Sequence, residues 1–159
     1  MTDIVDTATR SWMMSKIKGK NTKPEKMVRS ALHAEGYRFR LHRKDLPGKP
    51  DIVLPKYSAL IYVNGCFWHG HDCPLFKWPK TRREFWKEKI TANMRRDHRN
   101  YTEAAKSGWR VCILWECSIR GKSAQSQLMT MQKLFTWLKD GNSFTEIQEA
   151  AGDGRKPEE

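Results

Sequence analysis

The chain has 159 residues, 38% of them hydrophobic, and carries 30 Lys and Arg against 18 Asp and Glu, a formal net charge of +12. This size suits one folded domain, and no apolar run reaches the about 18 residues that a membrane span requires. The charge favours a polyanionic partner, most commonly nucleic acid, although a solvated basic surface without a partner is the alternative.

The first ten residues, MTDIVDTATR, are polar and acidic, which is not the composition of a signal peptide. We therefore expect an intracellular, cytoplasmic protein. Thiols stay reduced in that compartment. The four cysteines are then expected to be metal ligands or buried thiols rather than disulfides.

A helix is expected to begin at Thr22, with Pro24 in its first turn and Glu25 placed to close a capping box, and to end at Gly36. The remaining elements follow from hydrophobic periodicity and turn residues. They are a strand at 37–42, a short strand from Asp51, a buried strand at 59–63, an irregular loop at 64–80, a helix from a capping box at Thr81 to about 107, a strand at 109–115 and a helix at about 124–139 that Gly141 ends.

This order predicts an α/β fold in which helices flank a mixed central β-sheet. We expect residues 1–150 to form a single domain, in which 1–20 are a flexible arm able to contact nucleic acid, and 151–159 to be a disordered tail. The arm carries four cations: Arg10, Lys16, Lys18 and Lys20. Residues 81–100 carry seven Lys and Arg against three acids, which predicts either a phosphate-facing surface or a solvated face.

The loop sequence NGCFWHGHDC (64–73) concentrates metal-binding chemistry. Cys66, His71 and Cys73 lie in it, and Cys117 follows a buried strand, so all four meet if that strand lies beside 59–63. Thiolate and imidazole donors together favour Zn²⁺. His69 is the alternative ligand to His71, and the residues alone hardly decide between them. Cys112 lies inside an apolar strand and is expected to be a buried thiol.

If His71 binds zinc, His69 remains free to act as a general base. Asp97 falls on the stripe of the long helix that is expected to face inward, where it can orient an imidazole or form a buried salt bridge. This stripe comprises Trp86, Ile90, Met94, Tyr101 and Ala105. Asp51 opens a buried strand, where a carboxylate is costly unless it is paired or bound to a metal. Glu25 has two interpretations, a capping-box residue or an active-site acid.

Pro50-Asp51 before an apolar strand, followed by ALIYV, resembles the restriction-endonuclease-like nucleases. Those enzymes normally carry Glu-x-Lys at the end of the second strand, where this chain has Tyr62-Val63-Asn64. The GCFWHxHxC loop in its place resembles the very short patch repair endonuclease family. The resemblance runs from TRSWMMSKIKGKNTKPE through LPGKPDIVLP, NGCFWHGHDC, TRREFWKEKI and GWRVCILWEC.

The resemblance implies an enzyme that nicks one strand at T:G mismatches, 5′ to the mispaired T, in a bacterial cytoplasm. Cys66, His71, Cys73 and Cys117 would hold structural Zn²⁺, and Asp51 with the Val63 carbonyl would bind catalytic Mg²⁺. His69 would be the base, Asp97 its partner and Glu25 an outer-shell residue, while Phe67, Trp68 and Trp86 would intercalate into DNA. Asn64 stands where the family pattern has His, so an uncharged amide would contact the phosphate.

The resemblance further implies action on double-stranded DNA and a functional link to a DNA cytosine methyltransferase. A monomer is expected, because one nick needs one active site. Packing in the core is the alternative role for the aromatic residues, and above all for Trp86. Two other functions stay open at this point. One is a nuclease with a different target, of restriction or mobile-element type, and the other is a zinc-stapled DNA-binding module without catalysis.

Overall fold

The computed structural model describes residues 22–149, in which a mixed sheet with strand order β1-β2-β3-β4-β5 forms the centre. The β1–β2 and β2–β3 pairs are antiparallel, whereas β3–β4 and β4–β5 are parallel. The main elements are α2 (Lys23–Ala34), β1 (Arg40–Leu41), β2 (Ile52–Leu54), β3 (Ala59–Asn64), α3 (Arg83–Lys106), β4 (Arg110–Trp115), α4 (Ala124–Asp140) and β5 (Phe144–Ile147). The expected α/β fold is confirmed.

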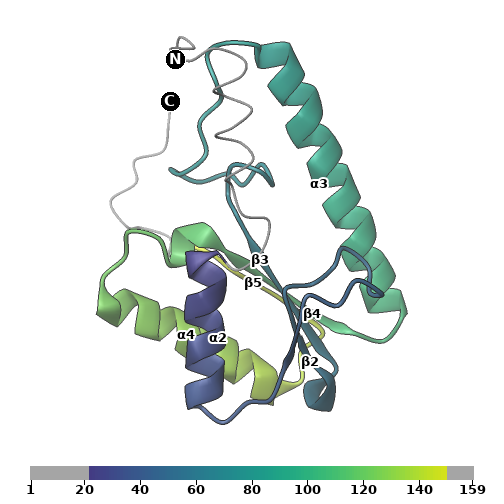
Figure 1. Cartoon of the computed structure of the whole chain (residues 1–159), viewed down its shortest axis with the longest axis vertical. Helices are drawn as coiled ribbons and strands as arrows, with labels where there is room; N and C mark the ends of the chain where they lie inside the picture. Colours follow the sequence, from purple (N-terminus) through teal and green to yellow (C-terminus); the bar gives the residue numbers. More distant parts are fainter. Residues whose placement is uncertain (1–21, 150–159) are drawn as a thin grey trace.

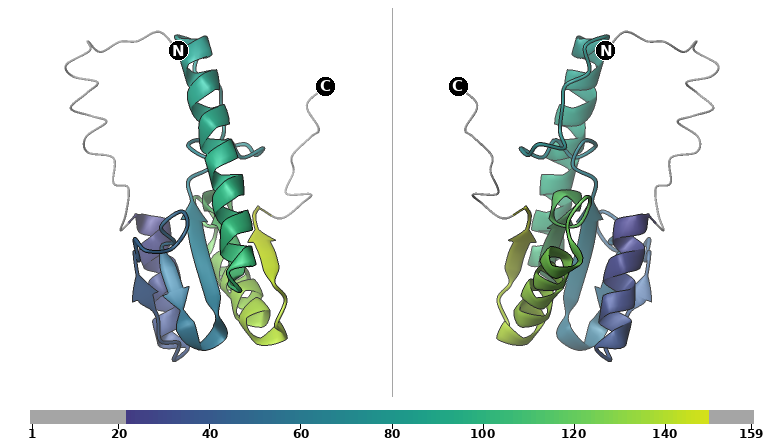
Figure 2. Two further views of the ribbon diagram at one scale, coloured as in Figure 1. Left: turned by 90° about the vertical axis from the view of Figure 1, so that its right-hand side faces the viewer. Right: turned by 90° about the vertical axis from the view of Figure 1, so that its left-hand side faces the viewer.

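Helices cover both faces of the sheet, α2 and α4 on one side and α3 on the other (Figures 1 and 2). The alternation of side chains along β3 explains how one strand serves both faces. Ala59 and Ile61 join the core under α2 and α4, and Leu60 and Tyr62 join the core under α3. β3 is therefore buried on both faces, as its apolar sequence predicts.

The parallel pairing of β3 with β4 sets the position of the candidate site. Asn64 and Trp115 are register partners at the ends of these strands. Cys66 and Cys117 come directly after these ends and thus lie at the same edge of the sheet. α3 continues past this edge and runs beside the loop that contains residues 65–82 (Figures 1 and 2).

The beginning of α3 differs from the expectation. A capping box at Thr81 is wrong, because the N-cap residue is Arg82, which has a left-handed backbone with φ 52° and makes no side-chain cap hydrogen bond. A side-chain cap needs an extended N-cap residue with a short polar side chain, and Arg82 provides neither. The corresponding prediction for α2 is confirmed at its cap, where the Thr22 hydroxyl accepts from the Glu25 N–H at 3.3 Å.

The two edge strands also differ from the expectation. The strand expected at 37–42 is reduced to two residues, because its partner β2 has only three and because His42 turns the chain with φ 50°. Tyr37 instead packs against Phe135 and Tyr57 in the core. β5, at 144–147, was not expected from the sequence, and it adds a parallel strand beside β4.

The inward face of α3 is partly misassigned by the sequence. Met94 is 47% exposed, whereas Asn93 is buried and takes the position toward the core. With about 3.6 residues per turn, Asn93 and Asp97 lie on the same side of the helix as Trp86 and Ile90. Met94 lies farther around the helix axis from this side. Asp97 nevertheless lies on the half-buried side, as expected.

The expected arm at 1–20 and the expected tail at 151–159 lie outside the described residues, as do the four cations of the arm. Among residues 22–149, no helix combines the length and the apolar character that a membrane crossing would need.

Candidate active site and metal centre

Four side chains meet at the edge of the sheet where β3 and β4 end. One ligand atom from each of Cys66, His71, Cys73 and Cys117 lies within 4.8 Å of the others, and all four residues are buried. Ligands around a tetrahedral ion with bonds of about 2.3 Å lie about 3.8 Å apart, so the set fits one ion after a small contraction. The arrangement can therefore hold a metal ion, and it contains His71 rather than His69.

The imidazole of His71 is oriented from two sides. Its Nδ1 lies 3.6 Å from Cys117 Sγ, and its Nε2 lies 2.8 Å from the side-chain oxygen of Gln148. Its ring stacks on Trp115 at 4.0 Å between centroids and an interplanar angle of 10°. An outer hydrogen bond of this kind fixes the tautomer and thereby presents Nδ1 to the metal position. Gln148 follows β5, so the strand that the sequence failed to predict also supports the metal centre.

The thiols of Cys66 and Cys117 have pKa values shifted in opposite directions. A hydrogen bond from Cys66 lowers the pKa of Cys117 to about 6, while the same contact and burial raise the pKa of Cys66. The backbone N–H of Glu149 also donates to Cys117 Sγ at 3.3 Å. One thiolate is thus already favoured near neutrality before any metal displaces the remaining protons. Cys112 stands apart from the cluster, is fully buried and has a raised pKa because of that burial, as expected of a core thiol.

The loop that carries these ligands is held tightly against α3. Gly70, between the two loop histidines, has φ +64°, and a Cβ on it would lie 2.6 Å from Met94 Sδ and 2.8 Å from Ile90 Cγ2. Only glycine fits both the backbone conformation and the contact. The side-chain amide of Asn93 also donates to the Trp68 carbonyl at 2.9 Å, so the buried polar residue of α3 holds the loop.

His69 and Asp97 form the expected pair. His69 Nδ1 lies 2.5 Å from Asp97 Oδ2, and their side chains are 25% and 16% exposed. When Nδ1 carries the proton that it donates to the carboxylate, the neutral ring has its lone pair on Nε2. The pair can therefore present a basic nitrogen that is fixed in orientation and still accessible from solvent.

Asp51 and Glu25 also meet, with a partner that the sequence reasoning missed. Ligand atoms of Glu25, His42 and Asp51 lie within 4.8 Å of one another. His42 Nε2 is 3.0 Å from Glu25 Oε2, and Asp51 Oδ2 accepts from the Val63 N–H at 2.7 Å. Burial and the charge of Glu25 raise the pKa of Asp51 to about 8. Two carboxylates so close in a buried place are typical of a cation site.

A half-buried tyrosine, Tyr101, lies beside these groups. The Asn64 side-chain amide donates to the Tyr101 hydroxyl at 2.7 Å, and Asn64 is 4% exposed. Burial raises the pKa of Tyr101, and the nearby charges of Asp97 and Asp51 raise it further. Asn64 was predicted as a phosphate contact, but its partner Tyr101 was assigned only to the core stripe.

The three residues predicted to intercalate form one aromatic cluster. The ring centroids of Phe67 and Trp68, Phe67 and Trp86, and Trp68 and Trp86 lie 5.2, 5.4 and 5.9 Å apart. All three are partly exposed. Phe76 extends the cluster by stacking on Phe67 at 5.8 Å, and Phe85 beside Trp86 is 45% exposed. The loop and the start of α3 thus present a joint apolar surface.

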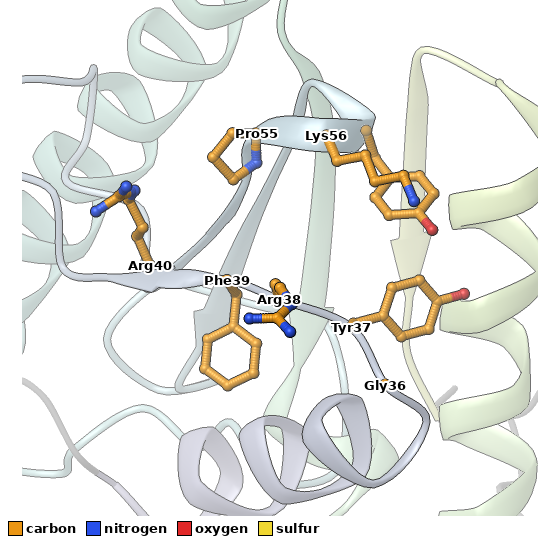
Figure 3. A pocket seen from close by; sticks show the side chains of 8 residues that line it. Gly36, Tyr37, Arg38, Phe39, Arg40, Pro55 and Lys56 are labelled. Carbon is orange, nitrogen blue, oxygen red and sulfur yellow. The ribbon is translucent and has the colours of Figure 1, made fainter.

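A separate basic pocket of about 410 Å³ lies at the other end of β2 from Asp51 (Figure 3). Arg38, Arg40 and Lys56 line it together with Tyr37 and Tyr57. Since the residues of the candidate active site are absent from its lining, this pocket is not part of that site.

His42 and Gln148 could have been found from weaker signals. His42 stands nine residues before Asp51, across the Leu-Pro-Gly-Lys-Pro turn, and a hairpin with that turn places the two side by side. Gln148 follows Phe-Thr-Glu-Ile at 144–147, where three of the four residues are β-branched or aromatic, a weak sign of a short strand.

Comparison with known proteins agrees with this geometry. The family model described as DNA mismatch endonuclease Vsr matches residues 2–75. The type II nicking enzyme V.XorIIP of Xanthomonas oryzae pv. oryzae is 51% identical over 119 residues, which cover 75% of this chain and 88% of the relative. The DNA mismatch endonuclease Vsr of Escherichia coli is 44% identical over 138 residues, covering 87% of this chain and 88% of the relative. The chain therefore belongs to the Vsr family of DNA mismatch endonucleases, as the sequence motifs indicated.

Proposed function

We propose that this protein is a Mg²⁺-dependent endonuclease that nicks one strand of duplex DNA at T:G mismatches, 5′ to the mispaired T, and so starts very short patch repair. The observation that carries the proposal is the contact between His69, on the loop with the Cys and His cluster, and Asp97 of α3, at the same sheet edge as Asp51. The relatives named as a mismatch endonuclease and as nicking enzymes support cleavage of a single strand at a mispair.

Zinc is the ion that best suits the Cys66, His71, Cys73 and Cys117 cluster, because three thiols and one imidazole are the donors of a closed structural site. The irregular loop has little core of its own, so the ion and Gly70 together would determine where His69 lies. The zinc centre would thus contribute to catalysis by holding His69 in position, without taking part in the chemical reaction.

Mg²⁺ suits the Asp51 carboxylate with the Val63 carbonyl as a further oxygen donor, and the nearby Glu25 carboxylate would lie in the outer shell. When bound, the ion supplies neutralisation of charge on the phosphate and on the leaving oxygen. The residues of the chain supply the other needs of the reaction. His69 Nε2 accepts the proton of the attacking water, and Asp97 holds the Nδ1 proton and stabilises the imidazolium that forms.

Asn64 is positioned to assist at the phosphate. One of its two amide hydrogens is used by Tyr101, and the second remains available to a phosphate oxygen. Because the amide is neutral, this contact gives a hydrogen bond without charge. The chain lacks the usual lysine of restriction-type nucleases at this strand end, which explains the need for His69 as the base.

Phe67, Trp68 and Trp86 favour the mismatch through the cost of unstacking. Inserting an aromatic ring between base pairs costs a few kcal/mol per step and costs least where the pairing is already weak. A rigid cluster fixed to the zinc loop therefore selects mispaired sites before base edges are read. A T:G pair is what deamination of 5-methylcytosine leaves, which links the activity to a DNA cytosine methyltransferase.

A panel of end-labelled duplexes tests the function. Wild-type protein with Mg²⁺ should nick T:G duplexes in the T strand, leave the T:A duplex intact and lose activity in EDTA. Equal cutting of T:G and T:A would contradict mismatch specificity and favour a nuclease with another target. Specific binding without any nicking would instead favour a DNA-binding module. One active site per nick predicts a monomer, which sedimentation can check.

A further inference from the structure

We propose that His42 is a direct nitrogen donor to the catalytic cation, so that Glu25, His42 and Asp51 form a mixed oxygen and nitrogen site that favours Mn²⁺ or Co²⁺ relative to Mg²⁺. The inference rests on the proposed function, because the cation concerned is the one that the nuclease would use. It adds a ligand that the sequence motifs do not contain, and it moves Glu25 from the outer shell, where the resemblance puts it, to direct coordination of the cation.

The sheet register brings His42 to this position. Leu41 pairs with Ile52 in the antiparallel β1–β2 ladder, so the next residue of β1 and the preceding residue of β2 face each other. The His42 N–H donates to the Asp51 carbonyl at 3.2 Å and locks the two backbones together. His42 has φ 50°, a left-handed conformation that a non-glycine residue adopts at a cost.

The donor distances fit a six-coordinate ion. In an octahedral shell with bonds of about 2.1 Å, adjacent donors lie about 3 Å apart and opposite donors about 4.2 Å apart. His42 Nε2 and Glu25 Oε2 lie 3.0 Å apart, which matches an adjacent pair, and the three donor atoms lie within 4.8 Å of one another. Three positions then remain for the phosphate, for water and for a backbone carbonyl.

The chemistry of the donors sets the metal preference. Oxygen donors suit Mg²⁺ and Ca²⁺, whereas an imidazole strengthens binding of first-row transition ions much more than binding of Mg²⁺. The Glu25 side chain is 2% exposed and that of His42 is 21% exposed, so the site is enclosed but accessible from the side of the histidine. A cation bound to Nε2 would replace the contact between this atom and Glu25 Oε2.

The test is Mn²⁺ binding to the full-length protein with its zinc centre filled, in the absence of DNA. Electron spin-echo modulation of bound Mn²⁺ should show coupling to ¹⁴N in the wild type and in His33→Gln, a control that removes an exposed histidine from the last turn of α2. His42→Gln should lose the coupling. Its Mn²⁺ affinity should fall about tenfold, while its Mg²⁺ affinity, measured by competition, should fall about threefold or less.

Nitrogen coupling that persists in His42→Gln, or no coupling in the wild type, would overturn the inference. Equal losses of Mn²⁺ and Mg²⁺ affinity would also overturn it, because they would indicate a general structural effect. Nicking of T:G duplexes by the wild type separates the two proposals. If the wild type nicks T:G duplexes but shows no nitrogen coupling, the proposed function stands and His42 is not a ligand. If it shows the coupling but does not nick, His42 is a ligand and the proposed function is wrong.

Discussion

Gly70→Ala should destabilise the protein and displace the catalytic loop. The substitution has two costs, which the structure separates. A non-glycine residue at φ +64° costs about 1–2 kcal/mol, and the added Cβ would lie 2.6 Å from Met94 Sδ and 2.8 Å from Ile90 Cγ2, an overpacking that costs about 1–3 kcal/mol more. Together these give about 2–5 kcal/mol, measured by urea unfolding of the zinc-loaded protein.

Gly121→Ala is the matched control. Gly121 has φ +71°, nearly the same backbone conformation, but a Cβ there would meet nothing within 4 Å. Gly121→Ala should therefore lower the free energy of unfolding only by the cost of the backbone conformation, about 1–2 kcal/mol. Met94→Ala in the Gly70→Ala background should recover part of the packing cost, since Met94 is the nearest contact. Equal destabilisation by Gly70→Ala and Gly121→Ala would refute the claim that the loop is packed tightly on α3.

Four further changes test other parts of the account. Asp97→Asn should lower the single-turnover nicking rate about 10²- to 10⁴-fold with mismatch binding unchanged in a gel-shift assay; a loss of binding equal to the loss of rate would contradict the assigned role. Cys117→Ala should lose most of the bound zinc in elemental analysis, whereas Cys112→Ala should keep it, because only Cys117 belongs to the cluster. The raised pKa of Asp51, about 8, means that cation-free protein loses stability as the pH rises from about 4 to about 8, so the Mg²⁺-induced increase in melting temperature should grow over the same range; a pH-independent increase would argue against Asp51 as ligand. Phe67→Ala should reduce the ratio of T:G to T:A binding in competition assays, and an unchanged ratio would assign Phe67 to packing alone.

The central strands were predictable because β3 and β4 are apolar except for Asn64 at the end of β3 and Arg110 at the start of β4, a pattern that few surface segments share. The edge strands were not predictable, since β1 has two residues and β5 has only four, which do not alternate between apolar and polar. Short strands owe their existence to a neighbour rather than to their own sequence. Likewise, the capping box expected at Thr81 failed because the preceding loop imposes a left-handed Arg82.

In the candidate site, too, some residues could be predicted from the sequence and others depend on tertiary contacts. The cysteines and His71 could be identified because their chemistry is rare and dense in sequence, and the parallel strands bring Cys117 to the loop. The choice of His71 over His69 depends on contacts to Trp115 and Gln148, which no local pattern contains. His42 was missed for a similar reason. Its proximity to Asp51 arises from the hairpin register, and an isolated histidine before a turn is only a weak signal of that register.

The most direct test of the central claim is the single-turnover rate of T:G nicking by His69→Ala, compared with the wild type and with His33→Ala at saturating Mg²⁺. If His69 is the base held by Asp97, the rate should fall about 10²- to 10⁴-fold, while mismatch affinity and bound zinc stay within about twofold of the wild type and His33→Ala nicks normally. A rate within tenfold of the wild type, with zinc and binding intact, would contradict the claim.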